Sequence, residues 1–272
     1  MILSEQTEMF RDTARGFARD RVAPHVAAWE AASEFPREAV AEMGALGFLG
    51  MLVPEDWDGS GASHVDYVAV IEEVSAADGG IGGLISVQNS VVCLPLLQFG
   101  SEEQKERWLK PLARGEMLGG FCLTEPHAGS DASNLKTRAR RDGNHWVIDG
   151  TKQFITQGAE ADVVIVFAAT DPAAGKRGIS AFLVPTDSEG FTVVRKEHKL
   201  GQRHIDASQL RFESVRVPAD AMLGEEGRGY RIALANLEGG RIGISAQAIG
   251  IARGAYEAAL SYAKERESFG KP

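Results

Sequence analysis

The sequence has few of the features that mark several protein classes. It contains two cysteines, Cys93 and Cys122, in apolar or small-residue surroundings. We therefore expect two reduced core thiols, with no disulfide framework and no metal site. No apolar run approaches the ~20 residues of a membrane span, and the opening residues lack the apolar block of a signal peptide. These absences predict a cytoplasmic protein with no membrane partner.

Positive charge is also in short supply. The 29 Lys and Arg residues are outnumbered by 38 Asp and Glu residues, which gives a formal net charge of -9 at pH 7. The acidic surplus is spread along the chain, so neither nucleic acid nor an anionic membrane surface is an expected partner. Apolar residues at 44% and charged residues at 25% are typical of a folded globular protein.

Two common enzyme motifs are missing as well. GxGxxG after a strand does not occur in the context of dinucleotide binding, and GxSxG does not occur at all. A Rossmann fold and a serine nucleophile elbow are therefore not indicated. The histidines lack metal-ligand spacing.

The pattern that is present divides the chain into three parts. Residues 1–118 show apolar residues at three- and four-residue spacing, which predicts helices. Residues 119–223 consist of short β-branched runs separated by turn residues, which predicts strands. Residues 224–272 return to a helical pattern rich in Ala and Gly on one face, so that this helix should pack closely against neighbours. The length of 272 residues also favours more than one domain.

We therefore expect an α+β multidomain fold: an all-α N-terminal domain, a middle antiparallel β-barrel-like domain and the start of a C-terminal helical bundle. Local signals add detail. Ser101 precedes a Glu-rich turn and is a good helix N-cap. Asp142-Gly143 and Asp149-Gly150 are candidates for tight turns between strands.

The stretch Phe121–Thr137, FCLTEPHAGSDASNLKT, is the most informative for chemistry. It places hydroxyls and carboxylates around Ala128 and Gly129, and small residues let backbone amides approach an anion. From these residues alone, a polar loop between two elements and a loop that binds phosphate or flavin both remain open.

CLTEPHAGSD in this stretch resembles the first signature of the acyl-CoA dehydrogenase family. KQFITQGAEAD, the LGQR…VRVP stretch, the Leu-Glu-Gly-Gly-Arg run at 237–241 and KERESFGKP follow in the family's order. The similarity spans nearly the whole chain, and implies an FAD-dependent enzyme that acts on an acyl-CoA.

The resemblance also implies roles for particular positions, with Ser130 shared between the cofactor and the CoA portion. The residues expected to bind FAD are Phe121, Leu123, Thr124, Ser130, Phe154 and Thr156. The residues expected near the acyl-CoA are Ser130, Glu238 and Arg241. Those expected to reach the FAD of a neighbouring subunit are Arg266, Ser268 and Phe269. The last set implies a homo-oligomer, either a tetramer or a dimer.

In the family, a carboxylate removes the α-proton of the thioester while hydride leaves the β-carbon, giving a 2-enoyl-CoA, and electrons pass to an electron-transfer flavoprotein. The resemblance places this base beyond residue 272, so we expect a truncated chain. Some members place it at the position of Gly240, which has no carboxylate. We expect Glu125 to be structural and His127 to have no catalytic role.

The expected substrate is a short or branched acyl-CoA. Two alternatives stay open: a catalytically incomplete fragment that binds FAD and acyl-CoA, and a related flavin oxidase of the acyl-CoA or nitroalkane oxidase type.

Overall fold

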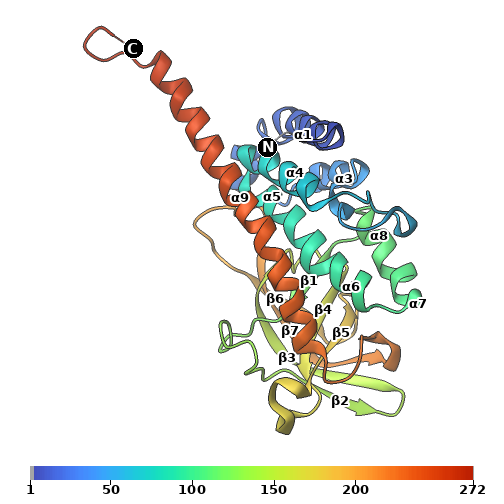
Figure 1. Cartoon of the computed structure of the whole chain (residues 1–272). Coiled ribbons are helices and arrows are strands. Elements are labelled where there is room, and N and C mark those ends of the chain that lie inside the picture. Colours follow the sequence, from blue (N-terminus) through green and yellow to red (C-terminus); the bar gives the residue numbers. More distant parts are fainter. Residues whose placement is uncertain (1–2, 272) are drawn as a thin grey trace.

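A computed structural model describes residues 3–271 of the protein. Its first part consists of helices (Figure 1). The earlier helices share one core, the later ones pack against the sheet, and together they lie against one end of the strands. They are α1 (Glu5–Phe17), α2 (Val26–Ala32), α3 (Arg37–Ala45), α4 (His64–Ala77), α5 (Gly79–Val87), α6 (Leu94–Phe99), α7 (Glu102–Gln104) and α8 (Lys110–Ala113).

Side-chain caps explain where several helices begin. Ser63 and Asp66 form a reciprocal capping box at the start of α4, which satisfies backbone N–H groups that have no partner within the helix. Ser101 forms the same arrangement with Gln104 at the start of α7, so the predicted N-cap is confirmed.

The helical segment Gly79–Phe99 corrects one expectation. Its 21 residues are long and apolar enough to cross a membrane, so the prediction that no apolar run approaches that length was wrong. Some 78% of its most apolar window is buried inside the protein. A central helix of a packed core has the same composition.

The strands form one sheet of eight, in the order β6-β7-β3-β2-β4-β5-β8, with β1 paired to β4. Most neighbours are antiparallel, as expected, but β1 and β2 each pair with β4 in parallel. The strands are β1 (Gly119–Cys122), β2 (Arg138–Asp142), β3 (His145–Thr156), β4 (Val163–Ala169), β5 (Ile179–Pro185), β6 (Phe191–Lys196), β7 (Ala207–Pro218) and β8 (Met222–Leu223).

One predicted turn is confirmed and the other is wrong. Asp142 pairs with His145 at the end of the β2–β3 hairpin, and Gly143 has φ +59° in the turn between them. Asp149 and Gly150 instead lie inside β3, where the register with β7 shifts. The Asp149 carboxylate accepts a hydrogen bond from the Ser214 amide at 2.7 Å, so this dipeptide forms a bulge within a long strand.

The two cysteine thiols are free and buried, as expected. Cys93 lies in the apolar cluster between α6, α8 and the sheet, and Cys122 lies on the other side of β1. Burial raises the pKa of the Cys122 thiol to about 12, although the Lys152 charge opposes this, and it raises the pKa of Cys93 even further.

A buried histidine joins the middle part of the chain to the N-terminal helices. His204 Nδ1 lies 3.0 Å from Glu30 of α2, and Nε2 lies 2.9 Å from Asp78, the N-cap of α5. Burial lowers the pKa of His204, but hydrogen bonds and charge from Asp78 and Glu30 outweigh burial and raise it above 6.5. Arg203 and Lys199 also face Glu30.

The long helix α9 (Gly229–Glu265) runs along the helical part and continues beyond it (Figure 1). The close packing predicted for its small residues is seen at Gly243 and Gly250, which face α4; the sequence did not identify that partner. A Cβ added at Gly243 would lie 2.5 Å from the Tyr67 hydroxyl, and one at Gly250 would lie 2.6 Å from Ser75 Cβ. The two helices therefore approach each other more closely than side chains at these positions would allow.

Candidate functional site

The two segments predicted to contact a flavin lie side by side. One follows β1 and the other ends β3. The Gln153 amide donates to the Thr124 carbonyl oxygen at 2.9 Å, which joins them. The side chains of Thr124 and Thr156 are half-buried, and within residues 3–271 we find no hydrogen bond from either hydroxyl. Two hydroxyls are thus available to a ligand where these two segments meet.

Phe154 has an unusual conformation in this region. Its φ is +58°, a backbone region that a bulky residue rarely adopts, and 62% of its surface is exposed. The register between β3 and β7 shifts between Lys152 and Ile155, so Phe154 lies in a bulge. Strain of this kind costs about 1–3 kcal/mol and concentrates at ligand sites. An aromatic ring held outward in this way fits a planar ring system stacked on it.

Beneath these residues lies a buried ion pair. Lys152 is fully buried, and its Nζ lies 2.8 Å from Glu125 Oε1 and 3.1 Å from the Leu123 carbonyl oxygen. Burial raises the pKa of Glu125, but the Lys152 charge and hydrogen bonds from Lys152, Thr137 and Lys136 outweigh burial and hold it below its usual range. Burial lowers the pKa of Lys152, and Glu125 opposes that shift.

The loop between Glu125 and Thr137 carries Ser130 at its exposed part. It begins with a tight bridge in which Glu125 and Ala128 exchange backbone hydrogen bonds. A Cβ at Gly129 would meet nothing within 4 Å. The loop therefore leaves backbone and hydroxyl groups open to a ligand, which fits an anionic cofactor portion.

Glu238 lines a cleft where the start of α9 meets the turn before β5. Four cationic side chains line the same cleft, and all are exposed; they are Lys176, Arg177, Arg228 and Arg231. Arg241 follows on α9, where it is exposed. Such a concentration of cations in an acidic protein favours a phosphate-bearing ligand.

The remaining predicted residues lie elsewhere. Arg266 follows the end of α9, and Ser268 and Phe269 lie in the short turn beyond it, where Ser268 bridges to Lys271. Phe269 is fully exposed. Figure 1 shows this end of the chain projecting away from the sheet. Within residues 3–271 the chain folds without bringing these three residues to Phe154 or Thr124.

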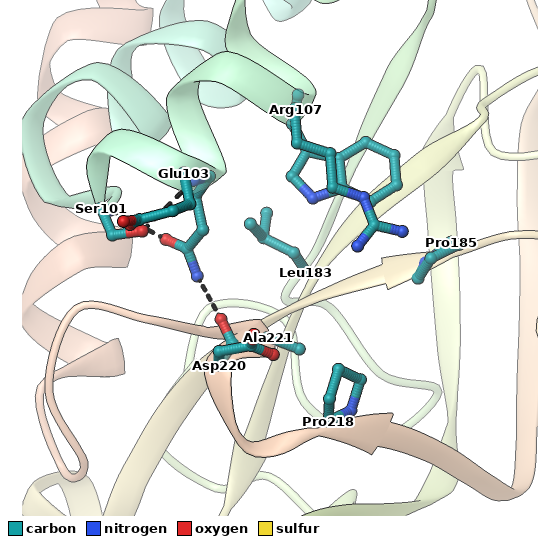
Figure 2. Close-up of a pocket in the computed structure, with 10 residues that line it drawn as sticks. Ser101, Glu103, Arg107, Leu183, Pro185, Pro218, Asp220 and Ala221 are labelled. Atoms are coloured by element: carbon teal, nitrogen blue, oxygen red, sulfur yellow. Dashed lines mark hydrogen bonds between the residues drawn. The ribbon is translucent and has the colours of Figure 1, made fainter.

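A cleft of about 330 Å³ between α7 and the sheet is distinct from this site (Figure 2). Gln104 Nε2 donates to the Asp220 carbonyl oxygen at 2.7 Å across one side of it. None of the predicted site residues lines it.

Sequence reasoning missed two residues that build the site. Lys152 is the buried partner of Glu125, and Gln157 Nε2 donates to the Gly119 carbonyl oxygen at 2.7 Å, which ties the end of β3 to β1. Lys152 and the next residue, Gln153, are both buried, so burial does not alternate at this point of β3, and the partner of the Lys152 charge is 27 residues away. Among residues 3–271 the acidic, Cys and His side chains form no cluster suited to a metal.

Comparisons with known proteins place this geometry in a family. The sequence matches three consecutive acyl-CoA dehydrogenase domains: the N-terminal domain over residues 4–116, the middle domain over 120–215 and the C-terminal domain over 227–272. It is 45% identical over 272 residues to an acyl-CoA dehydrogenase of Bacillus subtilis, and the match covers the whole chain and 72% of that protein.

Two further relatives agree. The chain is 44% identical over 270 residues to the mitochondrial short-chain specific acyl-CoA dehydrogenase of Bos taurus, covering 99% of the chain and 66% of that protein. It also superposes, with a TM-score of 0.98 and 42% identity, on a chain in the structure of the electron transferring flavoprotein of Acidaminococcus fermentans, covering all of this chain and 71% of that one. The chain thus spans about two thirds of the length of these relatives. It belongs to the acyl-CoA dehydrogenase family of FAD-dependent oxidoreductases.

Proposed function

We propose that the protein oxidises a short acyl-CoA between its α and β carbons to a 2-enoyl-CoA and passes the electrons to an electron-transfer flavoprotein. The observation that carries this proposal is Phe154, an exposed aromatic ring held at positive φ beside two half-buried threonine hydroxyls. FAD, when bound, supplies the acceptor for the hydride that leaves the β-carbon.

The residues around Phe154 have separate tasks in this proposal. The ring of Phe154 would stack on the flavin. Phe121 and Leu123, which the resemblance also assigns to the flavin, pack in the apolar cluster with α6 and α8, where Phe121 is half-buried and Leu123 is buried. The Thr124 and Thr156 hydroxyls donate to the ring system, where donors stabilise the negative charge that develops on reduction. Ser130 donates to the phosphate-bearing portions of cofactor and substrate.

The cleft at Glu238 supports the substrate assignment. Coenzyme A carries phosphates, and cationic side chains hold them by charge-assisted hydrogen bonds. We assign this cleft to the CoA portion, with Arg241 further along the same face of α9. Short-chain specificity is named for the bovine relative, and we extend it to this protein as part of the proposal.

We assign no catalytic base among residues 3–271. Glu125 is a poor proton acceptor because Lys152 and two backbone amides stabilise its charged form. Gly240 has no side chain to accept a proton. We further propose that Arg266, Ser268 and Phe269 contact the FAD of a neighbouring subunit, so that the active protein is a homo-oligomer in the cytoplasm.

The first test is reduction of the flavin. The protein is purified with FAD and mixed anaerobically with butyryl-CoA or isobutyryl-CoA while the absorbance of oxidised flavin is followed. We expect the flavin bound to this chain to stay oxidised. We expect it to bleach in a form extended by the family's remaining C-terminal length. Bleaching in this chain alone overturns the placement of the base, and returns Glu125 and Glu238 as candidates.

Reoxidation then separates the dehydrogenase from an oxidase. Dependence of turnover on an electron-transfer flavoprotein supports the proposal, and rapid reoxidation by dioxygen favours the oxidase alternative. If FAD does not bind to the folded chain, both the dehydrogenase proposal and the alternative of an FAD-binding fragment fail for this chain.

The cleft is tested separately by binding of coenzyme A. The double variant in which both Arg228 and Arg231 are changed to Gln should bind CoA roughly tenfold or more weakly, because hydrogen bonds from charged groups are lost. The matched control replaces Arg211 and Arg216, exposed on β7, and should leave binding unchanged. Equal affinities for both double variants contradict the assignment.

A further inference from the structure

The buried pair of Lys152 and Glu125 lies directly below the loop that carries Ser130. Both side chains are nearly or completely inaccessible, with Lys152 at 0% and Glu125 at 3% exposure. A buried ion pair seldom adds net stability, because removing two charges from water costs as much as their attraction returns. Stability alone therefore does not explain this pair.

The pair fixes the backbone on both sides of the loop. Glu125 accepts hydrogen bonds from the Lys136 amide at 2.7 Å and from the Thr137 amide at 3.1 Å, so one carboxylate joins the beginning of the loop to its end. The Lys152 ammonium donates to the Leu123 carbonyl oxygen at 3.1 Å. The carbonyls of Leu123 and Thr124 are thus both held by β3, by Lys152 and by the neighbouring Gln153 amide.

This arrangement determines which groups remain free. With the two carbonyls turned toward β3, the Thr124 hydroxyl is left without a partner among residues 3–271. The same contacts set the end of β3, which carries Phe154, beside the loop.

We propose that Lys152 is a positioning residue for FAD binding, which acts through Glu125 and the Leu123 carbonyl to hold residues 123–137 in the geometry that accepts the cofactor. The inference rests on the proposed function. Lys152 itself is covered by protein and does not need to contact the cofactor.

The test compares Lys152→Met with a variant in a second buried ion pair, Glu73→Gln. Glu73 is 4% exposed and is paired with Arg15 and Arg253, which join α1, α4 and α9 away from the loop. Lys152→Met and Glu73→Gln should both lower the urea midpoint of the apoprotein. FAD binding is then measured by quenching of flavin fluorescence and is expressed per folded molecule, with the folded fraction taken from circular dichroism.

We expect Lys152→Met to raise the Kd for FAD about tenfold or more, the loss typical of removing a group that orients ligand contacts. Glu73→Gln should leave the Kd unchanged. Glu125→Gln keeps the shape of the side chain but removes its charge, and it should also raise the Kd, which gives a second variant if Lys152→Met does not fold. Wild-type affinity in the folded fraction of both loop variants overturns the inference.

Hydrogen exchange of the apoprotein separates this inference from the proposed function. If the wild-type chain binds no FAD, the proposed function fails for this chain, but the positioning role can still be measured. The Lys136 and Thr137 amides should be protected in the wild type and in Glu73→Gln, and should lose protection in Lys152→Met. Retained protection in Lys152→Met overturns the role.

Discussion

The close packing of α9 on α4 gives a prediction with a control on the same helix. At Gly250, an added Cβ would lie 2.6 Å from Ser75 Cβ and well under 3.0 Å from the Glu72 carbonyl oxygen. At Gly239, an added Cβ would meet nothing within 4 Å. Gly250→Ala and Gly239→Ala therefore make the same chemical change on one helix, with contact at one position and none at the other.

The expected magnitudes follow from two terms. Replacing Gly with Ala in a helix interior stabilises by about 1 kcal/mol, because Gly loses more backbone freedom on folding. That gain applies at both positions. At Gly250 the neighbouring oxygen belongs to the backbone and cannot rotate away, so the overpacking cost lies toward the upper end of about 1–3 kcal/mol. Gly239→Ala should thus stabilise by about 1 kcal/mol, and Gly250→Ala should destabilise by about 1–2 kcal/mol.

The assay is urea unfolding followed by circular dichroism, with thermal unfolding as a second measurement. The difference of about 2–3 kcal/mol between the variants corresponds to roughly 5–10 °C in Tm for a chain of this size. Because the helix-propensity term cancels, the difference reports the packing term alone. If Gly250→Ala is as stable as Gly239→Ala, the close approach of α9 to α4 does not limit side-chain size there, and the reasoning is refuted.

Three further predictions concern single side chains. The raised pKa of His204 means that its contribution to stability is full below pH ~6.5 and is lost as pH rises through the raised value. The stability difference between wild type and His204→Gln in urea unfolding should therefore shrink as pH rises above this range. A difference that grows would contradict the charged pairing. Phe154→Leu should raise the Kd for FAD roughly three- to tenfold through lost aromatic stacking, while the urea midpoint of the apoprotein stays unchanged because the ring is exposed. An unchanged Kd in fluorescence titration would argue against stacking. Cys93 and Cys122 should not react with Ellman's reagent in the native protein and should both react in denaturant, since their thiols are buried; rapid native reaction of either would mean that its cluster opens.

Local sequence signals predicted local structure well. Ser101 forms its cap because the residues that complete it are three positions away. Asp142-Gly143 forms its turn because the strands on both sides pair directly with each other. Asp149-Gly150 has the same chemistry, but the pairing of β3 with the distant strand β7 keeps it inside a strand. Tertiary pairing therefore decides between a turn and a bulge where local preference allows both.

The candidate site contains features that the sequence alone did not predict. The resemblance implied that Thr124, Phe154 and Thr156 contact a flavin, but it did not reveal that Phe154 is strained or that Lys152 is buried. A lysine in a strand normally indicates a solvated face, because burial of an unpaired ammonium is costly. Its partner Glu125 precedes it by 27 residues, so no periodicity connects them.

The strain at Phe154 and the pair below it are two parts of one physical arrangement. Residues 155 and 156 pair with β7 through Ser208 and Ala207, and residue 152 pairs with Leu210 while its side chain reaches Glu125. With both neighbours fixed, the extra residue in the bulge has no extended conformation open to it, so Phe154 takes positive φ and its ring turns outward. The cost of about 1–3 kcal/mol is borne by the surrounding sheet before any ligand arrives. A ligand that stacks on this ring therefore meets a surface that needs little reorganisation, which lowers the entropic cost of binding.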